Sequence, residues 1–364
     1  MRRDVQMQTI TAISLVIAFS TAIAPTPASG AEKASWVSVP VYFATSRQFD
    51  DQKKTYTGYR NREKHNQNVD YGIVTVAVDL APGQTIDKQG VSKLGWKLTD
   101  KKAGQKLENI EQLPIEDFYK SLQMKHQSTE FKETCVFVHG YNNKFGAAAR
   151  SAARLSIALK EPVVLFSWPS AGKTKNYTTD ECNAEWSVRP FQVFLQGLVN
   201  RFEAKQVMTV SHSMGNRLVN WYLQSRFDNG NAQPKKFSEV VLTSPDIDRA
   251  TFRNYFYKVA ANGEKTRIFV SKKDLPLRLS KFVHGNPRTG SDLAKDEQPW
   301  ELPGNIEGTQ TVNFTEVDSG KMGHSIQYGV IGNMHRTNTP GADLTAEPDP
   351  TYKGDYLYVR KAAK

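Results

Sequence analysis

The sequence predicts an α/β fold with a mostly parallel central sheet and helices on both of its faces. Between residues 134 and 271, short valine-rich runs alternate with longer segments whose apolar residues recur at helical spacing. Such alternation builds parallel sheets with right-handed crossovers. The chain has 364 residues, 39% of them apolar, which is enough for one large core. Functional residues in this class of fold lie at the carboxyl ends of the strands.

We expect the elements in the following order. Two strands at 36–43 and 71–80 are joined by an Asn/Lys-rich loop, and the polar stretch 82–133 contains one helix, at 115–124. The alternating part comprises strands at 134–138, 162–168, 206–211, 239–243, 266–271 and 311–317, with helices at 145–159, 184–203, 214–226 and 249–260. We expect a single domain over 31–364, divided into N-terminal strands with an insertion (31–133), a core that carries the candidate site (134–335) and a Pro/Asp-rich tail (336–364) that is mobile as far as the apolar run at 356–359.

The most informative segment is 207–219, where a valine-rich strand stops abruptly at Ser-His-Ser-Met-Gly and a helical pattern follows. A strand, a tight turn with a serine at its apex and a helix are typical of the nucleophile elbow, usually written G-x-S-x-G. Gly215 is the small residue that the turn needs, and Ser211 replaces the first glycine. The turn lifts the hydroxyl of Ser213 above the sheet, with His212 beside it in a supporting position.

A second strand, at 134–138, runs directly into His139-Gly140-Tyr141. An H-G step after a buried strand upstream of the elbow is where hydrolases place an oxyanion donor. Gly140 lets the backbone approach a substrate carbonyl, so we predict the amides of Tyr141 and Met214 as the two oxyanion donors. Met214 opens the helix after the elbow, where the N–H groups lack partners within the helix. His139 is expected to support this loop.

In folds with this elbow, the acid and then the base follow the serine along the chain. Asp274 follows the second strand after the elbow, the usual position of the acid, whereas Asp246 follows the first and is the alternative acid. Asp248 is interpreted as the N-cap of the next helix. The predicted base is His324, in a glycine-containing loop after the strand at 311–317. Two further histidines downstream are interpreted as ordinary surface residues: His284 and His335.

With these residues assembled, the chain resembles the α/β-hydrolases, and more closely a bacterial esterase/lipase-like family of unknown function, DUF900. The resemblance covers roughly residues 36–335 and rests on the elbow and on the segments 39–47, 136–142, 166–170, 271–280 and 323–325. It implies an α/β-hydrolase fold with catalytic residues at Ser213, Asp274 and His324, the positions already reached by counting strands. It implies a reaction class and no particular substrate.

The sequence therefore predicts a serine hydrolase of carboxylesterase or lipase type, which cleaves a small-molecule or lipid-like ester through an acyl-enzyme. Two alternatives stay open: an acyltransferase with the same triad, and a non-catalytic envelope protein that uses the fold for binding. No cofactor is expected. No metal is expected either, because the chain contains no H-E-x-x-H motif, no EF-hand loop and no cysteine cluster.

Residues 1–30 have the pattern of a secretory signal peptide, with a charged start, an apolar run at 10–24 and a small-residue exit near Gly30. The mature protein is therefore expected in the periplasm or outside the cell, and an uncleaved anchor is the alternative. The chain has two cysteines, Cys135 and Cys182. They are expected toward opposite ends of the sheet, too far apart for a disulfide.

The formal net charge is +11. A charge of this sign favours peripheral contact with anionic surfaces of the cell envelope, such as lipid headgroups or acidic glycans. A local basic cluster at 53–64 fits either a solvated loop or a binding patch. The other basic residues are scattered, and no nucleic-acid partner is expected. The segments 170–184 and 284–308 fit either a role in specificity beside the site or plain surface packing.

Overall fold

The computed structural model describes residues 35–61, 69–80, 86–87, 90–91, 105–128, 132–203, 206–228, 237–261, 265–291, 308–318, 320–348 and 355–362. The predicted signal peptide at 1–30 and most of the segment 284–308 lie outside these ranges. None of the helices within them is long and apolar enough to cross a lipid bilayer.

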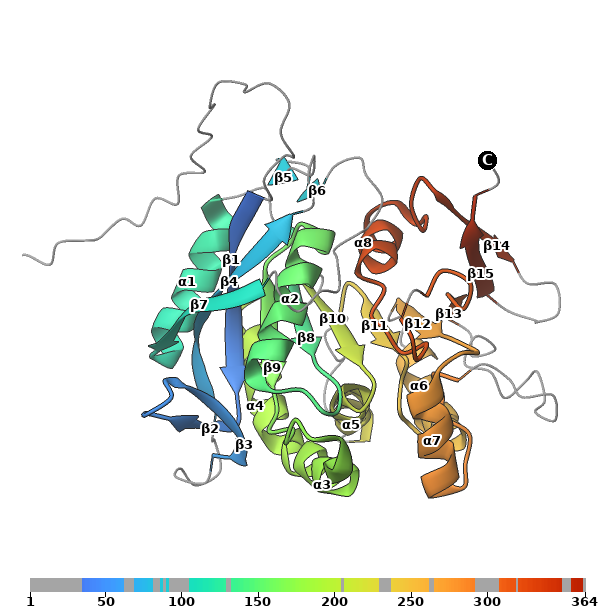
Figure 1. Ribbon diagram of the computed structural model, residues 1–364, viewed down its shortest axis with the longest axis horizontal. Coiled ribbons are helices and arrows are strands. Elements are labelled where there is room, and N and C mark those ends of the chain that lie inside the picture. The colour runs from blue at the N-terminus through green and yellow to red at the C-terminus, as the bar shows by residue number, and fades with distance from the viewer. Residues whose placement is uncertain are drawn as a thin grey trace, which may run out of the picture. The chain divides into compact units, whose positions relative to one another are not determined.

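A large, mostly parallel sheet forms the centre of the fold (Figure 1), as predicted. Its eleven strands lie in the order β14-β15-β13-β12-β11-β10-β8-β9-β1-β4-β7. The strands from β15 to β1 in this order are parallel, and the outer pairings are antiparallel. Their bounds are β1 Ser35–Thr45, β4 Asp70–Leu80, β7 Gln105–Leu113, β8 Thr134–Val138, β9 Val163–Ser167, β10 Val207–His212, β11 Val240–Thr243, β12 Thr266–Val270, β13 Thr309–Asn313, β14 Leu344–Pro348 and β15 Asp355–Lys361. Two short hairpins stand apart from it, β2 (Arg47–Asp50) with β3 (Thr55–Arg60) and β5 (Ile86–Asp87) with β6 (Gly90–Val91).

Helices cover both faces of this sheet (Figure 1), which also agrees with the prediction. One face packs against α1 (Ile115–Ser128), α4 (Val188–Val199), α5 (Gly215–Asp228) and α6 (Arg249–Ala261). The other packs against α2 (Phe145–Leu159) and α8 (Tyr328–Thr337). The remaining helices are η1 (Thr174–Asn176), α3 (Tyr177–Trp186) and α7 (Leu275–His284). Within β8, Val136 and Phe137 enter different cores, because successive strand residues point to opposite faces.

Four expectations about the elements need correction. The helix predicted at 184–203 is two helices, α3 and α4, which meet at Ser187. The polar stretch 82–133 contains strand β7 as well as α1. Helix α8 lies after the predicted base, in a segment for which no helix was predicted. The part of the tail expected to be mobile supplies strand β14, while β15, at the apolar run 356–359, pairs in parallel with β13.

Candidate active site

The predicted nucleophile, Ser213, lies at a backbone turn between β10 and α5. Its φ angle is +52°, in the left-handed region that costs a non-glycine residue energy. Several hydrogen bonds hold this conformation: the Ser213 amide donates to Thr243 O at 3.0 Å, and the side chain of Asn216 donates to Ser213 O at 2.8 Å. Ser211 in turn donates to Asn216 Oδ1 at 2.7 Å. The residue that replaces the first glycine of the elbow therefore stabilises the turn.

Two glycines bring the loop after β8 into contact with the elbow. A Cβ atom at Gly140 would lie 2.8 Å from Ser213 Cβ, and one at Gly215 would lie 2.4 Å from His139 O. Both distances are too short for any side chain, so glycine is required at each position. The predicted donor positions are next to these glycines in the chain, Tyr141 directly after Gly140 and Met214 directly before Gly215. Met214 directly precedes the first residue of α5.

The predicted acid and base are in direct contact. Asp274 Oδ2 and His324 Nδ1 are 2.7 Å apart, and Asp274 is 1% exposed. The other carboxylate oxygen, Oδ1, accepts from Leu277 N at 2.9 Å and so caps α7. Burial raises the pKa of Asp274, although the hydrogen bond from His324 acts in the opposite direction. A Cβ atom at Gly323 would lie 2.4 Å from the backbone of Lys273, so this glycine lets the loops that carry base and acid meet.

His212 connects the elbow to the loop of the base. Its Nε2 donates to His324 O at 3.2 Å, and the two rings are 4.7 Å apart. Burial, and then the charge of His324, hold the pKa of His212 well below its ordinary value, so the ring is neutral. Among the described residues, neither Ser213 Oγ nor His324 Nε2 has a hydrogen-bond partner. Such contacts in unliganded sites are often long and tighten when substrate binds.

The alternative acid, Asp246, is engaged elsewhere. Its carboxylate accepts from Tyr177 Oη at 2.5 Å and from Ser280 Oγ at 2.6 Å. Arg217 and Arg288 lie 3.4 and 3.2 Å from it. Burial would raise the pKa of Asp246, but the two guanidinium groups outweigh it and lower the pKa. The next acid, Asp248, caps α6 as expected, since its Oδ1 accepts from Thr251 N at 2.7 Å.

His139 lies beneath the loop after β8, as its predicted supporting role requires. Its ring stacks on Trp168 with the centroids 5.0 Å apart, and Trp168 Nε1 donates to His139 O at 2.7 Å. Arg47 Nη2 donates to His139 Nε2 at 3.2 Å, which leaves Nδ1 to donate to Gly140 O at 2.8 Å. Burial, and then the charge of Arg47, lower the pKa of His139 to about 3. The ring is therefore neutral, and it supports the loop through stacking and hydrogen bonds.

Two charged residues that hold this loop were not predicted. Buried Arg47 donates from Nη2 to Asn143 O at 2.7 Å and from Nε to Ser167 Oγ at 2.8 Å. Buried Asp180 accepts from Asn142 N at 3.3 Å and from Ser170 Oγ at 2.6 Å. Burial lowers the pKa of Arg47 to about 9, against the opposing charge of Asp180, so the guanidinium stays charged at neutral pH. Burial raises the pKa of Asp180, while its hydrogen bonds act in the opposite direction. Together they clamp residues 139–143, the segment that carries the predicted oxyanion donor.

The two histidines interpreted as surface residues are both half-buried and bonded to carboxylates. His284 Nε2 lies 2.7 Å from Glu181 Oε1, and His335 Nδ1 lies 2.7 Å from Glu239 Oε2. The surface interpretation was wrong because both histidines are on helices that pack against other elements, α7 and α8. The predicted separation of the cysteines agrees with the structure: Cys135 is a buried free thiol at the start of β8, and Cys182 is an exposed one on α3.

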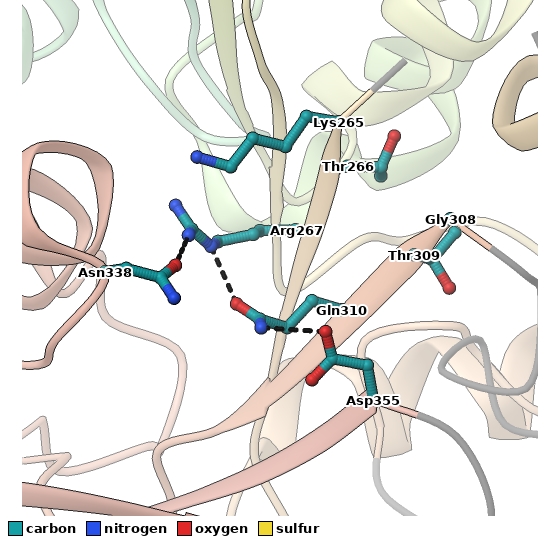
Figure 2. Close-up of a pocket in the computed structure, with 8 residues that line it drawn as sticks. All are labelled: Lys265, Thr266, Arg267, Gly308, Thr309, Gln310, Asn338 and Asp355. Atoms are coloured by element: carbon teal, nitrogen blue, oxygen red, sulfur yellow. Dashed lines mark hydrogen bonds between the residues drawn. The ribbon is translucent and has the colours of Figure 1, made fainter. Parts of the chain in front are cut away.

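A cavity of about 340 Å³ lies away from these residues, at the amino ends of β12, β13 and β15 (Figure 2). Arg267 lies at its centre, donating to Gln310 and Asn338, and Gln310 donates to Asp355. Arg267 also binds Glu239 at 2.5 Å. Because its donors already serve neighbouring side chains, this cavity contains no evident catalytic group. Across the described ranges, no cluster of His, Cys, Asp and Glu is suited to a metal ion.

Comparisons with known proteins assign the chain to a family. A family model described as "Alpha/beta hydrolase of unknown function (DUF900)" matches residues 116–333, and the chain belongs to this family. No curated protein matches. Solved structures similar to it include EstE5-PMSF, with 14% identity and a TM-score of 0.27 over 48% of this chain and 72% of that one.

Two further structures are an esterase/lipase from an uncultured bacterium and a hyperthermophilic esterase from the archaeon Pyrobaculum calidifontis. The first has 14% identity and a TM-score of 0.27 over 66% of this chain and 60% of that one. The second has 13% identity and a TM-score of 0.25 over 43% of this chain and 64% of that one. Similarities at this level do not bear on activity.

Proposed function

We propose that the protein is an exported serine hydrolase that cleaves carboxylic esters, with Ser213 as nucleophile, His324 as base and Asp274 as acid. The observation that carries the proposal is the 2.7 Å contact between His324 and buried Asp274, in a loop that His212 ties to the strained apex at Ser213. A protein that used the fold only for binding would need neither the strained serine nor a histidine bonded to a buried carboxylate.

In the proposed reaction, Ser213 Oγ attacks the ester carbonyl carbon while its proton passes to His324 Nε2. The carbonyl oxygen becomes an oxyanion and accepts hydrogen bonds from the amides of Tyr141 and Met214. The bond to the leaving alcohol then breaks, and His324 returns the proton to that alcohol. Water attacks the acyl-enzyme in the same way, and the acid is released as Ser213 regains its proton. Asp274 keeps Nδ1 of His324 protonated and stabilises the imidazolium.

Labelling by a fluorophosphonate tests the nucleophile. Ser213→Ala is expected to abolish covalent labelling and to lower ester turnover by several orders of magnitude, with an unchanged circular dichroism spectrum. The matched control is Ser211→Ala, two residues earlier, which should still be labelled. If labelling persists in Ser213→Ala, or is lost only in Ser211→Ala, the assignment of the nucleophile is wrong. An acceptor alcohol added to the assay distinguishes acyl transfer, which produces a new ester, from hydrolysis.

Export is proposed from residues 1–30 alone. The expected result is a periplasmic protein whose intact mass lacks about the first 30 residues and that has two free thiols. Full-length mass in the membrane fraction would instead show an uncleaved anchor. A mass lower by two hydrogens than that of the reduced form would contradict the separation of Cys135 from Cys182.

A further inference from the structure

Helix α7 exposes an apolar stripe next to the candidate site. Leu275, Leu279, Phe282 and Val283 have the i, i+4, i+7, i+8 spacing of one helical face. Their exposed fractions are 39, 59, 88 and 60%. In most globular proteins such a stripe faces the core, whereas here it faces outward.

The opposite face of α7 is buried and carries both an apolar residue, Leu277, and a polar one, Ser280. Ser280 is 3% exposed and donates to Asp246, while Arg288 Nε donates to Ser280 Oγ at 2.8 Å. His284 contacts Glu181 one turn further on, and Asp274 caps the first turn. Turning the apolar stripe inward would break these contacts and withdraw the Ser280 hydroxyl from the buried pair of Asp246 and Arg288. The outward orientation is therefore imposed by the fold.

A fifth exposed apolar side chain extends this surface. Met322 is 56% exposed, and its backbone O accepts from Leu275 N at 2.9 Å. We call Leu275, Leu279, Phe282, Val283 and Met322 the α7 patch. Along the chain, the patch lies between the predicted acid and base: α7 begins directly after Asp274, and Met322 is two residues before His324.

Cationic side chains border the α7 patch. Lys273, Arg278 and Lys321 are all exposed, from the residue before Asp274, from α7 itself and from the residue before Met322. An apolar stripe flanked by lysine and arginine is the pattern of helices that lie in the interface of an anionic membrane. The net charge of +11 attracts the whole molecule to the same surface. A second copy of the chain docked on the same surface would instead bring like charges together.

We propose that the α7 patch docks the protein on an anionic lipid bilayer, with Phe282 and Leu279 inserted among the lipids and the basic rim on their headgroups. Docking itself needs no catalysis. Its consequence for substrate class rests on the proposed function: the acid–base pair would lie close to the bilayer, so the preferred substrate would be an ester carried by lipid.

Co-sedimentation with vesicles tests the docking. The mature Ser213→Ala protein is used so that no lipid is hydrolysed, with vesicles of phosphatidylcholine alone or mixed with phosphatidylglycerol. We expect binding to the mixed vesicles that weakens with added salt. Leu279→Ser with Phe282→Ser should weaken it by about tenfold or more, because each residue loses apolar burial. Met124→Ser is the matched control, since Met124 on α1 is 58% exposed and Leu279 is 59% exposed; this control should bind like the parent.

Arg278→Gln with Lys321→Gln should weaken binding to the mixed vesicles several-fold and reduce its salt dependence. The proposal is overturned if no vesicle is bound, or if Leu279→Ser with Phe282→Ser binds as well as the control. It is also overturned if sedimentation velocity shows a dimer that only these two substitutions dissolve, because the patch would then serve a second copy. Turnover of a water-soluble ester by the protein with Ser213 intact is measured separately. Docking without turnover would refute the proposed function alone.

Discussion

Two histidine–carboxylate pairs lie at opposite ends of the parallel strands. In each pair, a histidine Nδ1 atom contacts a carboxylate oxygen. His324 Nδ1 lies 2.7 Å from Asp274 at the carboxyl ends of the strands, and His335 Nδ1 lies 2.7 Å from Glu239 just before β11. Their surroundings differ. Glu239 also binds Arg267 at 2.5 Å, whereas no arginine or lysine among the described residues forms an ion pair with Asp274.

The electrostatics of the two pairs are opposite in direction. Burial would raise the pKa of Glu239, but the hydrogen bond from His335 and the charge of Arg267 lower it, whereas burial prevails at Asp274 and raises its pKa. The second ring nitrogen of His335 lies 3.6 Å from Glu133, while that of His324 has no partner within the described ranges. In the proposed mechanism a histidine bonded to a carboxylate is not sufficient, because the second ring nitrogen must also be free to accept a proton from the nucleophile.

The largest contrast is expected between Asp274→Asn and Glu239→Gln. Asp274→Asn should lower kcat by a factor on the order of 10⁴, because an amide favours the wrong imidazole tautomer. Glu239→Gln should leave kcat of the folded enzyme nearly unchanged and destabilise the protein by about 3–5 kcal/mol, since Arg267 loses its buried partner. Steady-state kinetics and urea unfolding of both variants provide the measurement. Equal losses of kcat in the two variants would contradict the proposed difference between the two histidine–carboxylate pairs.

The alternative acid gives a second comparison on the same edge of the sheet. Asp246→Asn should reduce kcat far less than Asp274→Asn, because its carboxylate is engaged by Arg217, Arg288 and Tyr177. If Asp246→Asn proves the more damaging change, the acid belongs one strand earlier.

A smaller effect is expected from Arg47, which with Asp180 holds the loop after β8 in place. Arg47→Lys should lower kcat by about 10²-fold, because lysine lacks the several directed donors that hold the oxyanion loop in place. The rate of acylation by a fluorophosphonate should fall in parallel, and KM should change little. The control is Arg60→Lys on the adjacent hairpin, whose Nε donates to Asn183 Oδ1 on α3. A fall in stability with an unchanged acylation rate would show that Arg47 is structural only.

The smallest expected effect is on stability in acid. The folded-state pKa values of Glu239 and Asp246 are lowered, so their stabilising contribution is complete above their unfolded values near 4 and is lost as the pH falls below them. Asp274 acts in the opposite sense, because its raised pKa favours folding when it is protonated. Urea unfolding between pH 7 and about pH 3 should show a steeper loss in the parent than in Glu239→Gln. Parallel curves of stability against pH for the two proteins would contradict the contribution assigned to Glu239.

The periodicity of apolar residues was sufficient to predict a helix or strand where the buried face of that element is apolar. The strands of the parallel sheet and the elbow were predicted for this reason. Strand order then indicated Asp274 and His324 as acid and base but left Asp246 as an alternative acid. Helix α3 was not predicted because its buried residues include Asp180 and Asn183, which give no apolar period. Helix α7 was not predicted although its apolar residues have helical spacing, because its ten residues are shorter than the span over which a helical period is clear. The role of Arg47 depends on partners about 90 to 120 residues away in the chain, such as Asn143 and Ser167, which no local pattern can indicate.

The left-handed backbone of Ser213 has an evolutionary consequence. A non-glycine residue in this conformation costs about 1–3 kcal/mol, and glycine would remove most of that cost. Ser213→Gly is thus a single change that would destroy the nucleophile and stabilise the fold. Selection for stability alone would steadily favour that exchange. Under the proposed function, the need for the hydroxyl opposes that exchange, so relatives with glycine at this position are expected to lack the hydrolase activity.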